Sequence, residues 1–340
     1  MKALVLGANG HIGSHLVRAL LLDGCEVRGL VRRGSDLRAL RGLSLELVEG
    51  DVRDRPAVER AMEGRDCVFH LAAPTVETPE VLQIALDGTR NVLEAARARG
   101  VERVVYTSSV VTLGYTANPA VPVTEEAFRP GNTTPYQAAK FAAEAWLRQF
   151  VRRSNVPQVV TVNPTTTVGP LDYRPTPANR TIVEFMKKGS PFSFEAGLTV
   201  ADVEDVARGH LLAARSGLHG EAYILGGEPM KIAQLFGAMA DLTGLGRARL
   251  HFPRPLMIAL AAGLEAASLI SRKPPLMTVR QAREFVGRYG FYSSAKAARE
   301  LGYTFRPAKD ALKRAVLWFL GTDLIPPRRR QLLEQRMQRA

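Results

Sequence analysis

Short apolar runs alternate with amphipathic stretches along the first two thirds of the chain. The first run is followed by Ile12, Leu16 and Leu20 at helical spacing. The predicted strands are residues 3–6, 26–31, 45–49, 66–71, 104–107, 158–162 and 223–225. A helical pattern from about residue 79 to 99 separates the fourth strand from the fifth. This alternation of strands with helices predicts an α/β fold built on a doubly wound parallel sheet.

The pattern changes after Thr165, where several prolines interrupt the chain before a helical pattern begins at residues 182–187. Such an excursion from the edge of a sheet usually builds a ligand lobe. Asp202 or Glu204 can cap a later helix that buries Val206, His210 and Leu211 and returns to the sheet. The predicted divisions are a sheet domain of residues 1–164 and about 199–227, a smaller, discontinuous C-terminal substrate lobe of about 165–198 and 228–325, and a basic tail of 326–340.

Residues 256–270 are apolar nearly all round, but fifteen residues are too few to span a bilayer comfortably. We expect a buried helix, or a lid over the substrate pocket. The alternative is an interfacial helix that makes weak peripheral contact with a membrane, helped by the basic tail.

Composition and charge narrow the range of partners. The 340 residues carry a formal net charge of +13, but the arginines are spread along the chain without aromatic interleaving, so we expect no nucleic-acid binding. Cys25 and Cys67 lie in apolar surroundings without metal-ligand or redox spacing, which predicts buried free thiols and no metal site. The N-terminus enters a strand pattern at once, so we expect no signal peptide and a cytoplasmic protein.

Three glycines follow the first predicted strand at the spacing of a dinucleotide-binding loop. The segment reads Gly7-Ala-Asn9-Gly10-His11-Ile12-Gly13 and leads directly into a helix. Gly7 permits the tight turn, Gly10 lets the backbone approach a pyrophosphate, and Gly13 lets the helix pack closely on the strand. The segment therefore predicts a Rossmann-like domain whose opening loop binds a dinucleotide.

The end of the second predicted strand indicates which dinucleotide is preferred. An acidic residue there would bind the adenosine ribose, but this chain has Arg32 and Arg33. Two guanidinium groups suit a 2′-phosphate, so NADP(H) is preferred over NAD(H), which remains the alternative cofactor.

Tyr136 and Lys140 provide the candidate catalytic chemistry. They lie four residues apart in a segment of helix-forming residues, so their side chains share one helix face. An ammonium group beside a phenol favours phenolate and lowers the pKa of the tyrosine, which can then exchange a proton with a carbonyl or alcohol.

Together these motifs resemble the extended short-chain dehydrogenase/reductases of the NAD-dependent epimerase/dehydratase family. The resemblance covers residues 1–320 and is strongest to the dihydroflavonol-4-reductase-like and hopanoid-associated sugar epimerase group. The matching segments are the glycine loop, Asp51-Val52, His70-Leu71-Ala72-Ala73, Asn91, Thr107-Ser108-Ser109, Tyr136 with Lys140, and Asn163-Pro164.

The resemblance implies a role for each matching residue. Ser109, rather than Ser108, holds the substrate oxygen, Tyr136 is the acid/base, and Lys140 binds the nicotinamide ribose. The implied cofactor contacts are Gly7, Asn9, Gly10, His11, Ile12, Gly13, Arg32, Arg33, Asp51, Val52, Leu71, Ala72, Ala73, Thr107, Tyr136, Lys140, Asn163 and Pro164. His70 is expected to be structural. Relatives often dimerise through the helices around Asn91 and Tyr136, so a homodimer is expected.

One departure from the resemblance bears on the substrate. Many sugar-nucleotide members have an arginine that holds the diphosphate shortly before the segment that starts at Leu198, where this chain has Gly197. We therefore predict an NADP(H)-dependent reductase of a ketone or aldehyde on a small or lipid-like molecule. The alternatives are an NAD(P)-dependent sugar epimerase or dehydratase, and a cofactor-binding scaffold without turnover.

Overall fold

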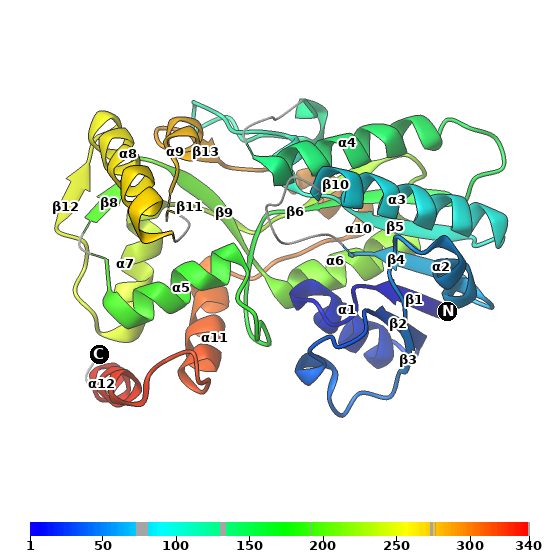
Figure 1. Cartoon of the computed structure of the whole chain (residues 1–340), viewed down its shortest axis with the longest axis horizontal. Coiled ribbons are helices and arrows are strands. Elements are labelled where there is room, and N and C mark those ends of the chain that lie inside the picture. Colours follow the sequence, from blue (N-terminus) through cyan, green and yellow to red (C-terminus); the bar gives the residue numbers. More distant parts are fainter. Residues whose placement is uncertain (73–80, 130–133, 191, 273–274, 276, 339–340) are drawn as a thin grey trace.

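Seven parallel strands form the main sheet of the protein (Figure 1). The structure is a computed structural model, and it describes residues 1–72, 81–129, 134–190, 192–272, 275 and 277–338. The strand order is β10-β6-β5-β4-β1-β2-β3, so the chain moves outward twice from β1. Their bounds are β1 Lys2–Leu6, β2 Glu26–Val31, β3 Glu46–Glu49, β4 Cys67–His70, β5 Arg103–Thr107, β6 Gln158–Pro164 and β10 Ala222–Leu225. All seven predicted strands are confirmed, with bounds shifted by two residues at most.

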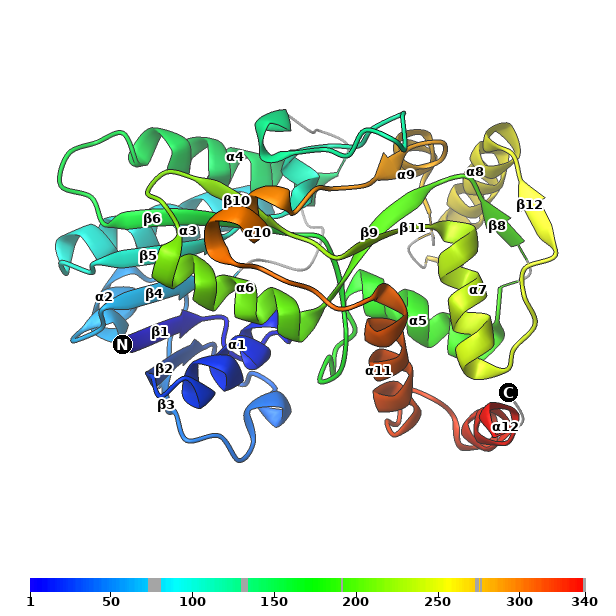
Figure 2. The same ribbon diagram turned by 180° about the vertical axis from the view of Figure 1, so that it is seen from behind.

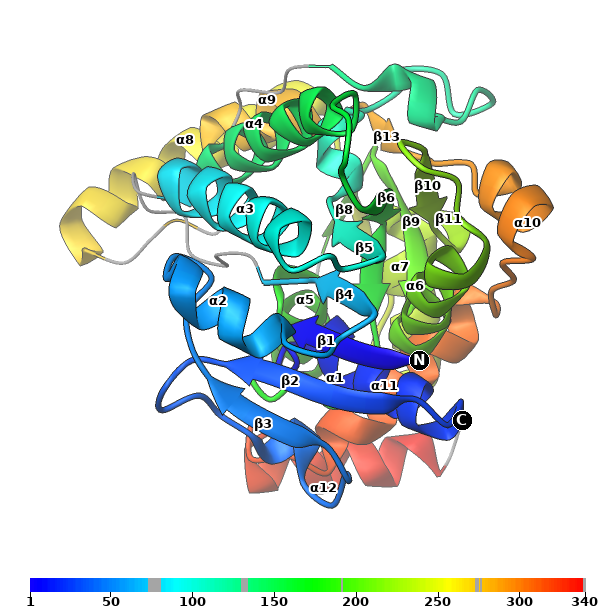
Figure 3. The ribbon, with the colours of Figure 1, turned by 90° about the vertical axis from the view of Figure 1, so that its right-hand side faces the viewer.

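Helices cover both faces of this sheet (Figure 3). One face carries α1 (His11–Leu22) and α6 (Val203–Ser216), whose apolar residues pack on β1, β2 and β6. The other face carries α2 (Arg55–Met62), α3 (Val81–Ala98) and α4 (Pro135–Phe150). Asp202 caps α6 by accepting a hydrogen bond from the Glu204 amide, as predicted. The predicted start of α3 at residues 79–80 lies outside the described residues.

A second region follows β6 and contains strands that the sequence pattern did not predict. Its larger sheet has the order β11-β9-β13, with β7 paired to β9. Its strands are β7 Thr166–Val168, β8 Phe192–Phe194, β9 Gly197–Asp202, β11 Glu228–Lys231, β12 Leu250–Phe252 and β13 Tyr289–Gly290. Five of these have four residues or fewer, too short to show a periodic pattern. The division of the chain into two domains stays a prediction.

Helices around these short strands complete the C-terminal region (Figure 2). They are α5 Pro177–Lys188, α7 Ile232–Thr243, α8 Arg254–Ser271, α9 Val279–Phe285, α11 Ala308–Leu320 and α12 Pro327–Met337. The remaining helix, α10 Ala295–Leu301, lies beside β10 and α6 of the main sheet. A separate apolar core joins α5, α7, α9 and α11. α5 starts five residues before the predicted helix because Pro177 occupies its first turn, where a missing amide costs nothing.

Two predictions about the C-terminal region need correction. Residues 327–337 are a helix, not a solvated tail: Leu333 is fully buried, and Arg329 donates to the Met186 carbonyl. Helix α8 was expected to be buried, but it is buried on one side only: Met257 and Ala261 pack into the core, whereas Leu269 is 83% exposed. Among the helices of the described residues, none is long and apolar enough to cross a membrane.

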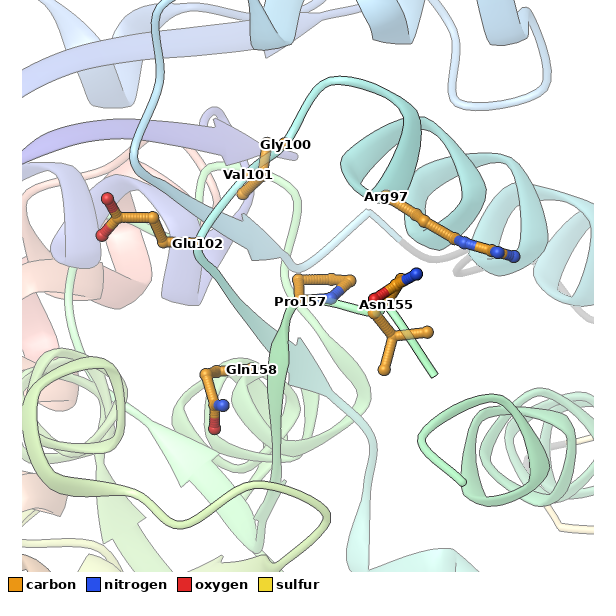
Figure 4. Close-up of a pocket in the computed structure, with 8 residues that line it drawn as sticks. Arg97, Gly100, Val101, Glu102, Asn155, Pro157 and Gln158 are labelled. Atoms are coloured by element: carbon orange, nitrogen blue, oxygen red, sulfur yellow. The ribbon is translucent and has the colours of Figure 1, made fainter. Parts of the chain in front are cut away.

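A polar pocket of about 260 Å³ lies at the amino ends of β5 and β6 (Figure 4). Its lining includes Arg97, Glu102, Asn155 and Gln158. Ligands of open α/β sheets bind at the opposite edge, where the strands end. This pocket is therefore separate from the candidate site.

Candidate active site

The glycine loop connects β1 to α1 with the backbone that the motif predicts. Gly7 has φ +87°, a backbone conformation that residues other than glycine rarely adopt. The Gly10 amide donates a hydrogen bond to the Gly7 carbonyl. A Cβ on Gly13 would lie 2.1 Å from the Gly7 oxygen, so only glycine lets the helix approach this closely. The Gly10 Cβ position meets no atom nearer than 3.3 Å, which leaves the outer side of the turn open.

The open side of this loop fits a dinucleotide phosphate. The N-terminus of α1 follows Gly10, which makes no side-chain cap, so the first helical amides face the loop. His11 is buried at this position and its Nε2 has no hydrogen-bond partner within the described part of the chain. Burial lowers the pKa of His11, so the ring is neutral at neutral pH and could donate from one nitrogen.

A loop from the C-terminal region covers the start of α1. The Pro170 carbonyl lies 3.1 Å from His15 Nε2, and the Asp172 carboxylate is 3.9 Å from His11 Nδ1. Asp172 is itself held by Asn179 and Thr176, which donate to its Oδ2. The sequence reasoning did not find this contact, because the partners are about 160 residues apart.

The carboxyl end of β2 presents the predicted basic residues. Arg32 and Arg33 are both exposed on the turn after the strand. The nearby Asp36 is paired with Arg38, which also stacks on the Tyr173 ring at 4.4 Å. Asn9 of the glycine loop donates to the Asp36 carbonyl at 3.4 Å, which ties this turn to the loop. Two exposed guanidinium groups thus lie on the turn that Asn9 ties to the glycine loop.

The ends of β3 and β4 lie at the same edge of the sheet. The Asp51 carboxylate accepts hydrogen bonds from Arg53, which lowers the pKa of Asp51. The Asn91 amide donates to the Val52 carbonyl at 3.1 Å and to that of Arg53 at 3.0 Å, so Asn91 holds this turn. Leu71 and Ala72 are half-buried at the end of β4. Ala73, also predicted to contact cofactor, lies outside the described residues.

Helix α4 begins with a capping box that fixes the position of Tyr136. The Thr134 hydroxyl accepts from the Gln137 amide, and the Gln137 side chain accepts from the Thr134 amide. Pro135 occupies the first helical position, as predicted. Tyr136 is therefore held in the first turn, next to the end of β5.

Tyr136 meets Ser109, the second serine after β5. Burial raises the pKa of Tyr136, and a hydrogen bond with the Ser109 side chain opposes that rise. The prediction that Lys140 lowers the pKa of Tyr136 is wrong, because burial has the largest effect on this pKa and raises it. The phenol therefore stays protonated at neutral pH.

Lys140 lies one helical turn further along α4 and is 6% exposed. Its Nζ donates to the Thr107 carbonyl at 2.9 Å and lies 5.7 Å from the Tyr106 ring centroid. Burial lowers the pKa of Lys140 to about 8, an effect that the Glu144 carboxylate opposes. The ammonium is thus largely charged at neutral pH and is anchored at the carboxyl end of β5.

Glu144 is a site residue that the sequence reasoning missed. It is fully buried and accepts hydrogen bonds from Ser108 at 2.5 Å, Thr112 at 3.0 Å and Arg148 at 2.8 Å. Its spacing of four from Lys140 on the same helix face was the available signal. Ser108 therefore serves this network, which leaves Ser109 as the serine next to Tyr136.

Other predicted residues make hydrogen bonds that support the site, and their contact with cofactor stays a prediction. Asn163 is fully buried, and its amide donates to the Ser109 carbonyl at 3.3 Å and to Glu144 at 3.3 Å. The Thr107 hydroxyl bonds with the His210 ring at 2.9 Å. His70 is structural, as expected: it lies 3.4 Å from the Thr89 hydroxyl, and burial lowers its pKa to about 3.

The remaining predicted cofactor contacts are backbone or packing positions. Pro164 is buried opposite Leu225 in the β6–β10 pair, and Ile12 packs against the core beneath the loop.

Cys25 and Cys67 are buried free thiols, as predicted, and burial raises the pKa of Cys67 to about 12.

Aromatic side chains occupy the place where many relatives have a diphosphate-binding arginine. A Cβ on Gly197 would lie 2.4 Å from the Phe291 ring and 2.9 Å from the Tyr289 ring, so no longer side chain fits there. The Phe285 ring lies 6.0 Å from that of Tyr115 and 6.1 Å from that of Phe194. The Phe291 and Tyr289 rings therefore fill the space beside Gly197, while Lys231 is its partner on the neighbouring strand β11.

The chain resembles known proteins over almost its whole length. It is 36% identical over 339 residues to sterol demethylase protein B of Methylococcus capsulatus, covering 96% of this chain and 100% of that protein. It is 33% identical to a putative dihydroflavonol 4-reductase of Synechocystis, covering 93% of both chains.

Solved structures and a family profile agree with these relatives. The crystal structure of gox2253 superposes with a TM-score of 0.81 at 34% identity, covering 94% of this chain and 97% of that one. The profile of the NAD dependent epimerase/dehydratase family matches residues 3–226, which contain the glycine loop, Ser109, Tyr136 and Lys140. The relatives support an NAD(P)-dependent oxidoreductase in general terms. The chain belongs to the NAD dependent epimerase/dehydratase family.

Proposed function

We propose that the protein is an NADP(H)-dependent reductase of a ketone or aldehyde on a lipid-like molecule. The observation that carries this proposal is the grouping of three side chains at the carboxyl end of β5. Ser109 hydrogen-bonds Tyr136, and the buried Lys140 is anchored on the Thr107 carbonyl one helical turn away. Hydroxyl, phenol and ammonium groups together suit a reaction that places negative charge on a substrate oxygen.

The cofactor would lie along the carboxyl edge of the sheet, from the Arg32 turn across the glycine loop to Tyr136. When bound, it supplies the hydride for carbonyl reduction. Tyr136 is protonated at neutral pH, so it can donate a hydrogen bond to the carbonyl and then its proton to the developing alkoxide. Ser109 holds the same oxygen, and Lys140, one helical turn further along α4, would bind the nicotinamide ribose.

The residues that hold Ser109 and Tyr136 reduce the motion needed for this reaction. Asn163 and Glu144 brace the loop that contains Ser109, while the Thr134–Gln137 capping box fixes the first turn of α4. Side chains fixed in this way need little rearrangement as charge develops on the substrate.

The two exposed arginines after β2 support NADP(H) as the preferred cofactor. Charge-assisted hydrogen bonds to a 2′-phosphate contribute about 1.5–3 kcal/mol each, so Arg32→Ala or Arg33→Ala should weaken NADPH binding by about tenfold to a hundredfold. NADH binding should be unchanged, and Arg41→Ala, an exposed arginine further along, is the matched control. Equal loss of NADH and NADPH affinity would exclude this assignment.

Two observations support a lipid-like substrate. The Phe291 and Tyr289 rings fill the space beside Gly197, so position 197 has no room for a long cationic side chain that would bind a diphosphate. A relative 36% identical to this chain has a name that refers to sterols. A ketone on a largely apolar skeleton, such as a sterol ketone, matches both.

The proposal is tested by incubating the protein with NADPH and a panel of sterol ketones, soluble aryl ketones and sugar nucleotides. We expect oxidation of NADPH, followed by absorbance, with at least one ketone, and a loss of about 10²–10⁴-fold in kcat for Tyr136→Phe. Unchanged turnover in Tyr136→Phe would remove the catalytic assignment.

The second candidate is a sugar epimerase or dehydratase, which the family match supports. Such an enzyme returns the hydride to its substrate, so it converts a sugar nucleotide with no net change in cofactor. The same panel separates the two functions, because only the reductase consumes NADPH.

A further inference from the structure

The outer face of helix α8 is apolar and exposed along its length. It consists of Leu256, Ala259, Ala262, Gly263, Ala266, Ala267 and Leu269, which we call the α8 face. Leu256 is 46% exposed and Leu269 is 83% exposed. These positions cover one side of the helix, while Met257 and Ala261 on the other side are buried. Figure 3 shows α8 projecting beyond α3 and α4.

Basic residues lie at both ends of α8 and on the neighbouring helix α9. Between residues 249 and 288 the chain has seven basic residues and two acidic ones. Arg254 and Arg272 lie at the two ends of α8, and Arg280, Arg283 and Arg288 lie in and after α9, all five exposed. An apolar helix face with a cationic rim is the arrangement by which interfacial helices bind anionic lipid surfaces.

Both acidic residues of this segment have hydrogen-bond partners within the protein. Glu265 accepts from the Val279 amide at 3.0 Å, which joins α8 to α9. Glu284 accepts from the Gln137 side chain at 2.9 Å. Neither residue is fully exposed, so the described surface of this segment is dominated by arginine and apolar side chains.

The same contacts connect the α8 face to the candidate active site. Gln137 is the neighbour of Tyr136 on α4, so α9 packs directly on the first turn of the catalytic helix. The Phe285 ring of α9 also meets Tyr115, six residues after Ser109. A bilayer that contacts α8 would therefore lie on the same side of the molecule as Tyr136.

We propose that the α8 face docks on an anionic phospholipid bilayer and that the apolar substrate enters the site from that bilayer. Docking rests on the surface alone, whereas delivery of the substrate rests on the proposed function. Burial of the apolar face supplies attraction that salt does not screen, and each arginine near an anionic surface adds attraction that salt does screen. Binding should therefore need both anionic lipid and low salt.

The test is flotation of the full chain with vesicles of phosphatidylcholine, with and without phosphatidylglycerol, at low and high salt. We expect flotation with the anionic vesicles at low salt, and a loss of about tenfold or more in bound fraction for Leu256→Glu with Leu269→Glu. The matched control is Leu22→Glu with Leu218→Glu, which adds the same charge at two other exposed leucines and should float like the parent chain. All three proteins should bind NADPH equally.

Three results would overturn the proposal. The first is no flotation at low salt, and the second is equal loss in the control pair. The third is a parent dimer that becomes monomeric in Leu256→Glu with Leu269→Glu, without vesicle binding, since the face would then belong to a second copy. A failure of the reductase proposal shows instead as absent NADPH oxidation with any ketone, while flotation remains.

Discussion

Adjacent serines perform different tasks at the end of β5. The Ser108 hydroxyl donates to the buried Glu144, whereas Ser109 bonds with Tyr136 and caps the short turn that follows. The first contact braces the site within the core, and the second places a hydroxyl beside the phenol. We therefore expect Ser108 to contribute to stability and Ser109 to contribute to catalysis.

The two serines should respond differently to substitution by alanine. Ser109→Ala should lower kcat for ketone reduction by about 10²–10³-fold, with the melting temperature nearly unchanged, because it removes a group that stabilises negative charge on the substrate oxygen. Ser108→Ala should instead reduce the free energy of unfolding by about 1–3 kcal/mol, because Glu144 loses a buried donor. Steady-state kinetics and denaturant unfolding measure both; the reverse pattern would assign the catalytic serine to position 108.

The pH dependence follows from the charge on Lys140. Burial lowers the pKa of Lys140 to about 8, so the ammonium is lost as pH rises through that value. The kcat for reduction should be level below pH 8 and should fall above it. Lys140→Met should be slow at every pH, and a parent profile that stays flat to pH 10 would contradict the role of the ammonium.

Lys140 should also change how stability depends on pH. Because its folded-state pKa is lower than that of the unfolded chain, the unfolded state binds more protons between pH 8 and about 10.5. Burial of the charged lysine thus costs stability below pH 8, and this cost disappears as pH rises. The difference in unfolding free energy between the parent chain and Lys140→Met should change in that window, with the parent gaining.

At the scale of elements, the glycine loop depends on close approach between β1 and α1. Gly13→Ala places a Cβ 2.1 Å from the Gly7 oxygen, so the helix has to move away from the loop. Overpacking of this kind costs about 1–3 kcal/mol of stability, and the displaced amides should weaken NADPH binding strongly. Gly263→Ala in α8 is the control, because its Cβ meets nothing within 4 Å. Normal NADPH affinity in Gly13→Ala would contradict the position of the pyrophosphate.

The sequence predicted the elements whose signal is local. The seven strands, the glycine loop and the cap of α6 depend on runs of apolar residues, on spacing or on a capping residue, and all are in the structure. The sheet of β7, β9, β11 and β13 was missed, since its strands are short and pair across distant parts of the chain. Glu144 was missed because its spacing of four from Lys140 shows only a shared helix face, and does not indicate that the glutamate is fully buried.

The same distinction explains the incorrect predictions. The tyrosine pKa was argued from a neighbouring charge alone, whereas burial depends on the surrounding fold and had the larger effect. Helix α8 was expected to be buried because it is apolar, yet a helix can be apolar on a side that nothing in the described chain covers.

At the scale of the whole molecule, ionic contacts connect the two core regions. Arg306 precedes α11 and makes a two-pronged contact with Asp205 on α6, at 2.9 Å and 3.0 Å. Arg314 of α11 lies 3.3 Å from the fully buried Asp202 carboxylate. These contacts hold the C-terminal region against α6, which packs on the seven-stranded sheet.

Arg306→Ala should therefore lower the free energy of unfolding by about 2–3 kcal/mol, because the half-buried Asp205 pair loses charge-assisted hydrogen bonds. Arg299→Ala, whose ion pair with Glu300 is exposed, should change stability by less than about 1 kcal/mol. Denaturant unfolding of both variants measures the difference. Equal effects would mean that the Arg306 contact adds nothing beyond a surface ion pair.

The most direct test of the account is to follow the hydride. NADPH deuterated at the transferred position is incubated with a ketone that the protein reduces, and the product alcohol is examined by mass spectrometry. The account predicts deuterium on the carbinol carbon, one NADPH consumed for each alcohol formed, and loss of both in Tyr136→Phe. Conversion of a sugar nucleotide with no net consumption of NADPH, and no ketone reduced, would contradict it.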